Sequence, residues 1–208
     1  MTVDLPPGLR CIVFDVGETL VDETSSWSSL AVAAGITPFT LMASLGVLID
    51  RDQDHRRVWS MLGVDRPRTE HRLASVDLYP DALACLRAVG TAGLKVGIAG
   101  NQPTRVEAEL RAVGFAPDFI ASSARWGVEK PSPEFFERVV AESGLRPTSI
   151  LYVGDRLDND VLPARRAGMR TAHLRRGPWG HVHAARPEAE LADLRLGSLT
   201  ELTATLTD

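Results

Sequence analysis

The feature that most constrains the fold is a series of short apolar runs, each of which ends at polar or turn-forming residues. Their length suits β-strands, and their nearly continuous apolar character is typical of strands that are buried on both faces. Such strands occur mainly in parallel sheets that carry helices on both sides, so the runs predict an α/β protein. The runs lie at residues 11–14, 94–99, 118–122, 149–153 and, more weakly, 170–174.

Amphipathic patterns typical of helices separate the later runs. Residues 80–91, 103–113 and 133–143 place apolar side chains three or four positions apart, and a shorter pattern spans 158–167. Proline lies near the start of the three longer patterns and glycine follows their ends, as expected at helix boundaries. The tail from Arg186 onward predicts a last short strand and a closing helix. This alternation predicts a doubly wound, Rossmann-like parallel sheet.

Residues 24–77 break the alternation of strands and helices. They contain stretches with helical character and no convincing strand. We therefore expect a small helical insertion after the first strand of the α/β core. The predicted division is residues 1–22 and 78–208 for the core and residues 23–77 for the insertion.

Composition and charge argue against several classes of protein. A formal net charge of -4, with 24% charged residues, does not suggest a surface that binds nucleic acid. No apolar stretch approaches the roughly 18 residues of a membrane-spanning helix, and the N-terminus lacks a secretory signal pattern. We expect a soluble cytoplasmic protein with no membrane partner, in which Cys11 and Cys85 are reduced core residues. The sequence does not indicate an oligomeric state.

Polar residues follow three of the predicted strands at the edge where open parallel sheets bind ligands. Asp15, Asn101 and Asp155 come at or just beyond the ends of these runs, and Lys130 lies in the loop after the third run. Two carboxylates and an ammonium at one edge would form a site for a divalent cation and an anionic substrate. Mg²⁺ suits such a site because it takes few carboxylates and leaves room for phosphate oxygens.

These residues lie within four short motifs that resemble those of a known family. The motifs are FDVGETLVD at residues 14–22, GN at 100–101, EKPSPEFF at 129–136 and VGDRLDND at 153–160. In this order and spacing they resemble the motifs of the haloacid dehalogenase-like (HAD) hydrolase superfamily. The resemblance spans nearly the whole chain, and it implies that the helical insertion is a cap of the C1 type.

The resemblance implies a role for each matching residue. Asp15 would be the nucleophile that attacks phosphorus, giving an aspartyl-phosphate, and would also bind Mg²⁺. Lys130 would neutralise charge on Asp15 and on the phosphoryl oxygens. Asp155 and the backbone carbonyl of Gly17 would bind the metal directly. Asp160 would hold a metal-bound water or orient Lys130.

Two positions depart from the phosphatase pattern of this family. The residue two after the nucleophile, normally an aspartate that protonates the leaving alcohol and later activates water, is Gly17. The second motif has Gly100 in place of serine or threonine, so Gly100 and Asn101 would bind substrate through a backbone N–H or the Asn101 amide. Either Glu18, Asp22 or a residue of the cap would supply the missing proton transfer, or the substrate would be an acyl, aryl or anomeric phosphate whose leaving group needs little protonation. Otherwise Glu18 is expected to be a solvated turn acid, and Asp22 to cap the first cap helix or line the entrance.

Three functions are consistent with this pattern. The favoured one is a Mg²⁺-dependent phosphatase that acts on a small phosphorylated metabolite through an aspartyl-phosphate. The alternative, suggested by Gly17 and Gly100, is a catalytically weak or inactive binding or regulatory protein on the same fold. A 2-haloacid dehalogenase is the least favoured, because dehalogenases of this family do not need the metal that Asp155 would bind.

Overall fold

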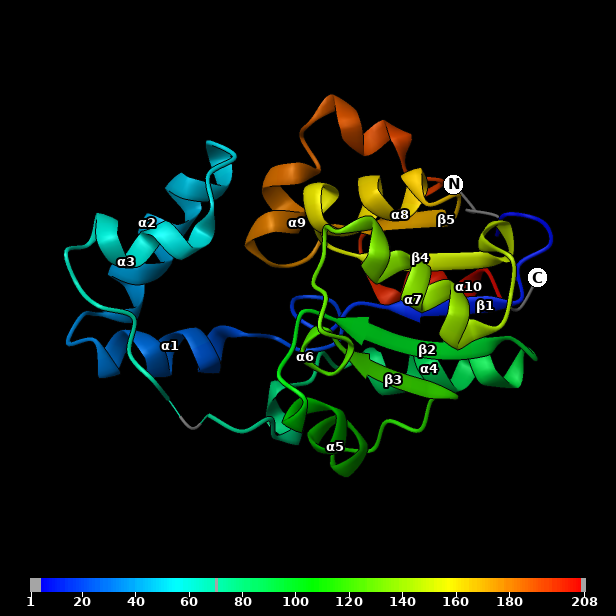
Figure 1. The fold of residues 1–208 in the computed structure, drawn as a ribbon, viewed down its shortest axis with the longest axis horizontal. Helices are drawn as coiled ribbons and strands as arrows, with labels where there is room; N and C mark the ends of the chain where they lie inside the picture. The colour runs from blue at the N-terminus through cyan, green and yellow to red at the C-terminus, as the bar shows by residue number, and fades with distance from the viewer. Residues whose placement is uncertain (1–4, 70, 207–208) are drawn as a thin grey trace.

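The core of the molecule is a parallel sheet whose first strand lies in the middle (Figure 1). Within residues 5–69 and 71–206, which the computed structural model describes, six strands pair in the order β3-β2-β1-β4-β5-β6. The chain builds one half of the sheet up to β3 and then crosses over to build the other half from β4 onward. The predicted doubly wound parallel sheet is therefore confirmed. The strands are β1 (Cys11–Phe14), β2 (Lys95–Gly100), β3 (Phe119–Ser122), β4 (Ile150–Gly154), β5 (Arg170–Leu174) and β6 (Leu194–Leu196).

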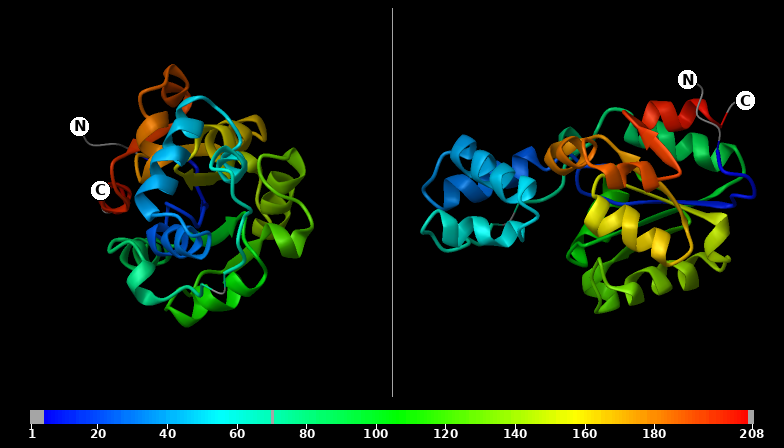
Figure 2. Two further views of the ribbon diagram at one scale, coloured as in Figure 1. Left: turned by 90° about the vertical axis from the view of Figure 1, so that its left-hand side faces the viewer. Right: turned by 90° about the horizontal axis from the view of Figure 1, so that it is seen from above.

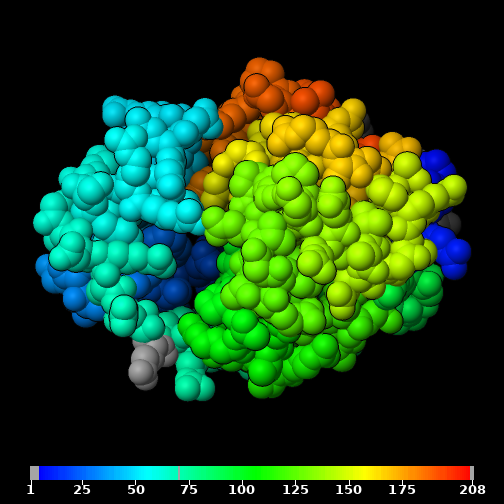
Figure 3. Space-filling view, viewed as in Figure 1, coloured from blue at the N-terminus to red at the C-terminus, as the bar shows by residue number. Residues whose placement is uncertain are grey.

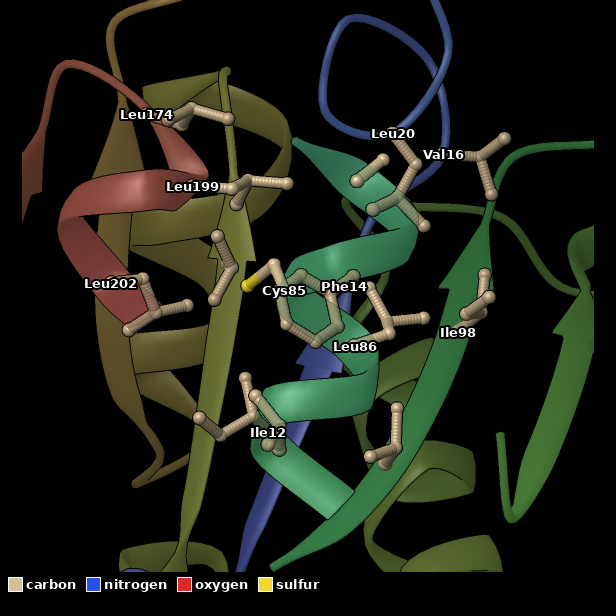
Figure 4. Close-up of a cluster of buried hydrophobic side chains, with 14 of the residues drawn as sticks. Ile12, Phe14, Val16, Leu20, Cys85, Leu86, Ile98, Leu174, Leu199 and Leu202 are labelled. Carbon is tan, nitrogen blue, oxygen red and sulfur yellow. The ribbon is translucent and has the colours of Figure 1, made fainter. Parts of the chain in front are cut away.

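Helices cover both faces of this sheet. The core helices are α4 (Ala82–Thr91), α5 (Arg105–Ala112), α6 (Ser123–Trp126), α7 (Pro133–Ser143), α8 (Leu162–Arg166), α9 (Gly177–His183) and α10 (Leu199–Ala204). Ile12 and Phe14 of β1 pack with Cys85 in a cluster shared with α4 and α10 (Figure 4). Cys11 and Val13 belong to a second cluster, on the opposite face, with side chains of α7 and α8. All four β1 side chains are fully buried, which explains why this strand is a continuous apolar run.

Between β1 and α4 the chain forms a helical insertion that stands to one side of the sheet (Figures 1 and 2). Its helices are α1 (Thr24–Ala33), α2 (Pro38–Asp50) and α3 (Val58–Met61). Thr37 caps α2 by accepting a hydrogen bond from the Thr40 N–H at 3.2 Å, and Pro38 takes the first helical position. The insertion has a small apolar cluster of its own, which includes Trp59 and reaches Trp179 of α9. The sequence boundaries of core and cap stay a prediction.

No single helix in the described parts of the chain is long and apolar enough to span a bilayer. Helices α1 and α2 would meet the length and composition only as a pair, and they are bent by 112° where they join.

One predicted helix differs from the expectation. The pattern over 158–167 predicts a single short helix, whereas the chain forms a π-helical turn at Leu157–Val161 before α8 begins. In this turn the Val161 N–H donates to the Arg156 carbonyl, five positions back, at 3.1 Å. Turns of this kind are often found at functional sites. This one directs the Asp160 side chain back against Gly154, at the end of β4.

Candidate active site

The ends of three neighbouring strands bring the predicted site residues together. Strands β2, β1 and β4 lie side by side, so Asn101, Asp15 and Asp155 meet at one edge of the sheet. The Asp15 N–H donates to the Val153 carbonyl at 2.9 Å, which extends the pairing of β1 and β4 by one residue. The Asp15 and Asp155 residues are only 7% and 2% exposed, so water screens their charges little.

Lys130 lies between two of the carboxylates. Its Nζ donates to Asp15 Oδ1 at 2.6 Å and to Asp160 Oδ1 at 2.5 Å. Burial alone would lower the pKa of this ammonium, but the charges of Asp15 and Asp160 overcome that effect and hold the pKa well above its usual value. Asn101 fixes the Lys130 backbone, because its Oδ1 accepts from the Lys130 N–H at 2.8 Å and its Nδ2 donates to the Lys130 carbonyl at 3.0 Å. The lysine therefore stays charged and is held in position.

Asp155 carries the strongest indication of a cation. Oxygens of Asp15, Asp155 and Asp160 lie within 4.8 Å of one another, and all three residues are buried. Among the described residues, Asp155 Oδ2 is buried with no hydrogen-bond partner. Burial, followed by the charges of Asp160 and Asp15, raises the Asp155 pKa well above its usual value. A cluster of hard oxygen donors with an unpaired buried atom fits Mg²⁺, whereas an uncompensated buried carboxylate is unfavourable.

Asp160 joins Lys130 to the loop that follows β4. One of its oxygens accepts from Lys130, and Oδ2 accepts from the Arg156 N–H at 3.0 Å. Burial raises its pKa to about 6, although Lys130 opposes the shift. A Cβ atom built on Gly154 would lie 2.5 Å from Asp160 Cγ, so only glycine leaves room for this side chain. Of the two roles expected for Asp160, these contacts favour the orientation of Lys130.

Gly100 lies directly against the candidate nucleophile. A Cβ atom at this position would be 2.7 Å from Asp15 Oδ1. A serine or threonine therefore does not fit beside Asp15 in its present position. Both polar atoms of the adjacent Asn101 amide already bond to the backbone of Lys130. The binding of substrate by Gly100 and Asn101 stays a prediction.

Two acids that the sequence suggested as replacements for the missing aspartate are engaged elsewhere. Glu18 is 6% exposed, so the expectation that it is a solvated turn acid is wrong. Its Oε2 accepts from the Tyr79 hydroxyl at 2.6 Å, and its Oε1 accepts from the Glu23 N–H at 3.0 Å. Asp22 Oδ1 accepts from the Thr24 N–H at 2.8 Å, beside the start of α1.

Glu23 is a site residue that the sequence did not single out. Its Oε1 would lie 2.7 Å from a Cβ atom built on Gly17, so its carboxylate faces the position where a side chain at residue 17 would begin. Burial, then the charges of Glu18 and Asp15, raises the pKa of Glu23 to about 7. The only signal in the sequence was a second acid after Asp22, at the start of the insertion. A tight turn, in which the Val21 N–H donates to the Val16 carbonyl at 3.0 Å, brings that acid back to Gly17.

A cavity lies between the insertion and the core, above these residues. Figure 3 shows the recess between the two parts of the molecule. Its volume is about 1040 Å³, and Asp15, Lys130 and Asp155 line it together with Glu23. Aromatic rings and arginines from both parts also line it: Trp27, Trp59, His55, Trp179, Arg56, Arg66, Arg68, Arg105 and Arg156.

Two buried histidines hold the loop that carries Asp155. His173 Nε2 lies 2.9 Å from the Asp155 carbonyl oxygen, and His183 Nδ1 accepts from the Leu157 N–H at 3.0 Å. Because Nδ1 accepts a hydrogen bond, His183 is neutral, and burial lowers its pKa to about 4. These contacts fix the backbone around Asp155 before any ligand arrives.

Comparison with known proteins identifies the family. A family model described as haloacid dehalogenase-like hydrolase matches residues 9–168, which is well over half of the chain. The chain belongs to the haloacid dehalogenase-like hydrolase family. The matched span of this family member includes Asp15, Lys130, Asp155 and Asp160.

Two curated relatives are phosphatases. A glyceraldehyde 3-phosphate phosphatase of Methanopyrus kandleri is 31% identical over 134 residues, or 63% of this chain and 57% of the relative. A phosphoglycolate phosphatase of Vibrio vulnificus is 26% identical over 224 residues, covering 93% of this chain and 94% of the relative. The match to the first relative thus spans less than two thirds of that protein's length.

Solved structures show the same fold. A crystal structure described as a dehalogenase superposes with a TM-score of 0.71 at 22% identity, covering 98% of this chain and 100% of the other. At this level of identity the likeness concerns the fold alone.

Proposed function

We propose that this protein is a Mg²⁺-dependent phosphatase that hydrolyses a small phosphorylated metabolite through an aspartyl-phosphate on Asp15. The observation that carries the proposal is the arrangement around Asp155. Three buried carboxylates lie together, one ammonium bonds to two of them, and Asp155 Oδ2 has no partner among the described residues. This arrangement lacks positive charge, and a divalent cation with a phosphate group would complete it.

In the proposed reaction Asp15 supplies the nucleophile. One of its carboxylate oxygens forms a bond to phosphorus while the bond from phosphorus to the ester oxygen breaks, and water then hydrolyses the aspartyl-phosphate. Lys130, held at 2.6 Å from Asp15 Oδ1, neutralises the charge of the carboxylate and of the phosphoryl oxygens. Asp160 keeps the ammonium aimed at Asp15. Asp155, Asp15 and the Gly17 carbonyl would hold Mg²⁺, which would stabilise the negative charge on the phosphoryl group.

The cavity and the relatives support a small phosphorylated substrate. The space of about 1040 Å³ is at the upper end of the range of small-molecule sites. Both relatives described above have names that denote hydrolysis of phosphorylated metabolites of a few carbon atoms. We regard the helical insertion, residues 23–77, as the cap that closes over the substrate, and the cytoplasmic location remains a prediction.

Two other functions are tested by the same experiment. Gly17 and Gly100 lack the side chains that the phosphatase pattern provides, which favours a catalytically weak binding or regulatory protein as the second candidate. A 2-haloacid dehalogenase has the weakest support, because a reaction without a cation would leave the buried Asp155 Oδ2 without a partner.

The test is a panel of phosphate esters assayed with Mg²⁺ and with a chelator, for the wild type and Asp15→Asn. Phosphate release that requires both Mg²⁺ and Asp15 supports the phosphatase. Wild-type turnover no higher than that of Asp15→Asn on every ester, together with retained phosphate or Mg²⁺ binding, supports the binding protein. Chloride release from a 2-haloacid that a chelator does not affect supports the dehalogenase.

A further inference from the structure

The space that Gly17 leaves open is filled by a carboxylate from the insertion. A Cβ atom on Gly17 would lie 2.7 Å from Glu23 Oε1 and 2.8 Å from Glu23 Cδ. The Glu23 carboxylate therefore takes the place where a longer side chain at position 17 would project. It also lines the same cavity as Asp15 and Lys130.

Neighbouring groups orient this carboxylate. The Glu23 N–H donates to Glu18 Oε1 at 3.0 Å, and Tyr79 in turn holds Glu18 through a hydrogen bond of 2.6 Å. Trp27 Nε1 donates to Glu23 Oε2 at 3.4 Å. Both oxygens lie close to Gly17, because a Cβ atom there would be 2.7 Å from Oε1 and 3.2 Å from Oε2.

We propose that Glu23 performs the proton transfers for which residue 17 has no side chain. The inference rests on the proposed phosphatase function. The other acids nearby are less suited, because both oxygens of Glu18 already accept hydrogen bonds and Asp22 bonds to the backbone at the start of α1. Glu23 is partly buried, and it lines the cavity that would hold the substrate.

The proton balance follows from two displacements. In the first, the bond between Asp15 and phosphorus forms, the ester P–O bond breaks, and the protonated Glu23 gives its proton to the departing oxygen, releasing an alcohol. In the second, the Glu23 carboxylate takes a proton from water as the water oxygen bonds to phosphorus. The bond between phosphorus and Asp15 breaks, inorganic phosphate leaves, and Glu23 is protonated again.

Glu23→Gln tests the proposal because glutamine keeps an acceptor for Trp27 but cannot exchange the proton. Two substrates are compared: the alkyl phosphate that the wild type hydrolyses fastest in the ester panel, and p-nitrophenyl phosphate, whose leaving group needs no protonation. We expect kcat on the alkyl phosphate to fall about 10²–10⁴-fold. On p-nitrophenyl phosphate we expect a burst of about one equivalent of nitrophenol at nearly the wild-type rate, followed by slow turnover. A purely structural role would slow the burst as well.

Asp22→Asn is the matched control, because asparagine can still accept the hydrogen bond from Thr24. It should stay within about threefold of the wild type on both substrates, since a retained hydrogen bond leaves the turn in place. Wild-type kcat for Glu23→Gln on the alkyl phosphate, or a burst slowed as much as steady-state turnover, would overturn the assignment. Absence of any Asp15-dependent turnover in the wild type would instead overturn the proposed function itself, and this inference with it.

A relocation experiment gives an independent result if Glu23→Gln folds poorly. Gly17→Asp alone places two carboxylates in one space, so we expect it to lower turnover. Glu23→Ala removes the clash, and the double variant Gly17→Asp with Glu23→Ala should turn over the alkyl phosphate at least tenfold faster than Glu23→Ala. A double variant no faster than Glu23→Ala, in protein shown by circular dichroism to be folded, would contradict the proposal.

Discussion

Replacement of Lys130 by methionine removes the ammonium that joins two buried carboxylates. Lys130 is 3% exposed, and it lies 2.6 Å from Asp15 Oδ1 and 2.5 Å from Asp160 Oδ1. Methionine fills a similar volume, so packing is largely kept and the change is mainly one of charge. Removal of one partner of a buried ion pair destabilises proteins by about 3–5 kcal/mol. We expect a loss of unfolding free energy of that size in the metal-free protein at pH 8.

The loss should depend on pH. In the wild type the pKa of Asp160 is already raised to about 6, and removal of the ammonium would raise it further. A carboxyl group whose pKa is higher in the folded state than in the unfolded state binds more protons when folded. The folded state therefore loses stability as the pH rises through the interval between the two values. The unfolding free energy of Lys130→Met should accordingly be closer to that of the wild type at pH 5 than at pH 8.

Urea unfolding followed by tryptophan fluorescence, in EDTA at pH 5 and pH 8, measures both effects. Lys95→Met is the control, because Lys95 bonds to the carbonyl oxygens of Glu142 and Ser143 instead of to a carboxylate. This control should change the unfolding free energy by no more than about 1.5–3 kcal/mol, the usual size for a hydrogen bond made by a charged group. If the unfolding free energy of Lys130→Met at pH 8 lies within about 1 kcal/mol of the wild-type value, the reasoning about buried charge is refuted.

Three further predictions follow from single contacts. Gly154→Ala places a methyl group 2.5 Å from Asp160 Cγ. We expect kcat to fall at least about tenfold and the unfolding free energy measured in urea to fall by about 1–3 kcal/mol. An unchanged kcat would contradict this prediction. Gly100→Ser, which restores the hydroxyl of the family pattern, should lower kcat instead of raising it, because its Cβ would lie 2.7 Å from Asp15 Oδ1; a rise in kcat would show that the carboxylate moves freely. The pKa of His183 in the folded protein is lowered to about 4, whereas in the unfolded chain it is about 6.5. As the pH falls from about 6.5 toward 4, His183 is therefore protonated in the unfolded state but not in the folded state, and the unfolding free energy should fall by about 3 kcal/mol at most. His183→Asn keeps an acceptor for the Leu157 N–H and should flatten that decline in urea titrations at several pH values; an equally steep decline would exclude His183 as its source.

The fold and much of the proposed site could be predicted because both depend on local patterns. A strand buried on two faces must be a short apolar run, and the residue after such a strand falls at the ligand-binding edge of the sheet. Asp15 and Asp155 were found in this way, and their positions at the ends of adjacent strands follow directly from the sheet order. Lys130 could be found only through its motif, since nothing in the local pattern shows that its loop folds back to Asp15.

The remaining features depend on contacts between segments, which the local sequence pattern does not show. Glu23 reaches Gly17 only because the turn before α1 reverses the chain, and a second acid after Asp22 looks like an ordinary helix start. Glu18 is buried because the Tyr79 hydroxyl, 61 positions away, satisfies its carboxylate. The π-helical turn that directs Asp160 toward Lys130 replaces what the apolar spacing predicts as regular helix. Each of these differences concerns how a polar side chain is satisfied, which hydrophobic periodicity does not encode.

The measurement that tests the central claim most directly is detection of phosphate on Asp15 during turnover. The enzyme, mixed with Mg²⁺ and the phosphate ester that it hydrolyses fastest, is quenched in acid and reduced with borohydride, which converts an aspartyl-phosphate to homoserine. Peptide mass spectrometry should then find homoserine at position 15, in greater amount in Glu23→Gln than in the wild type, and none in Asp15→Asn. Phosphate release without modification of Asp15, or modification of a different residue, would contradict the account.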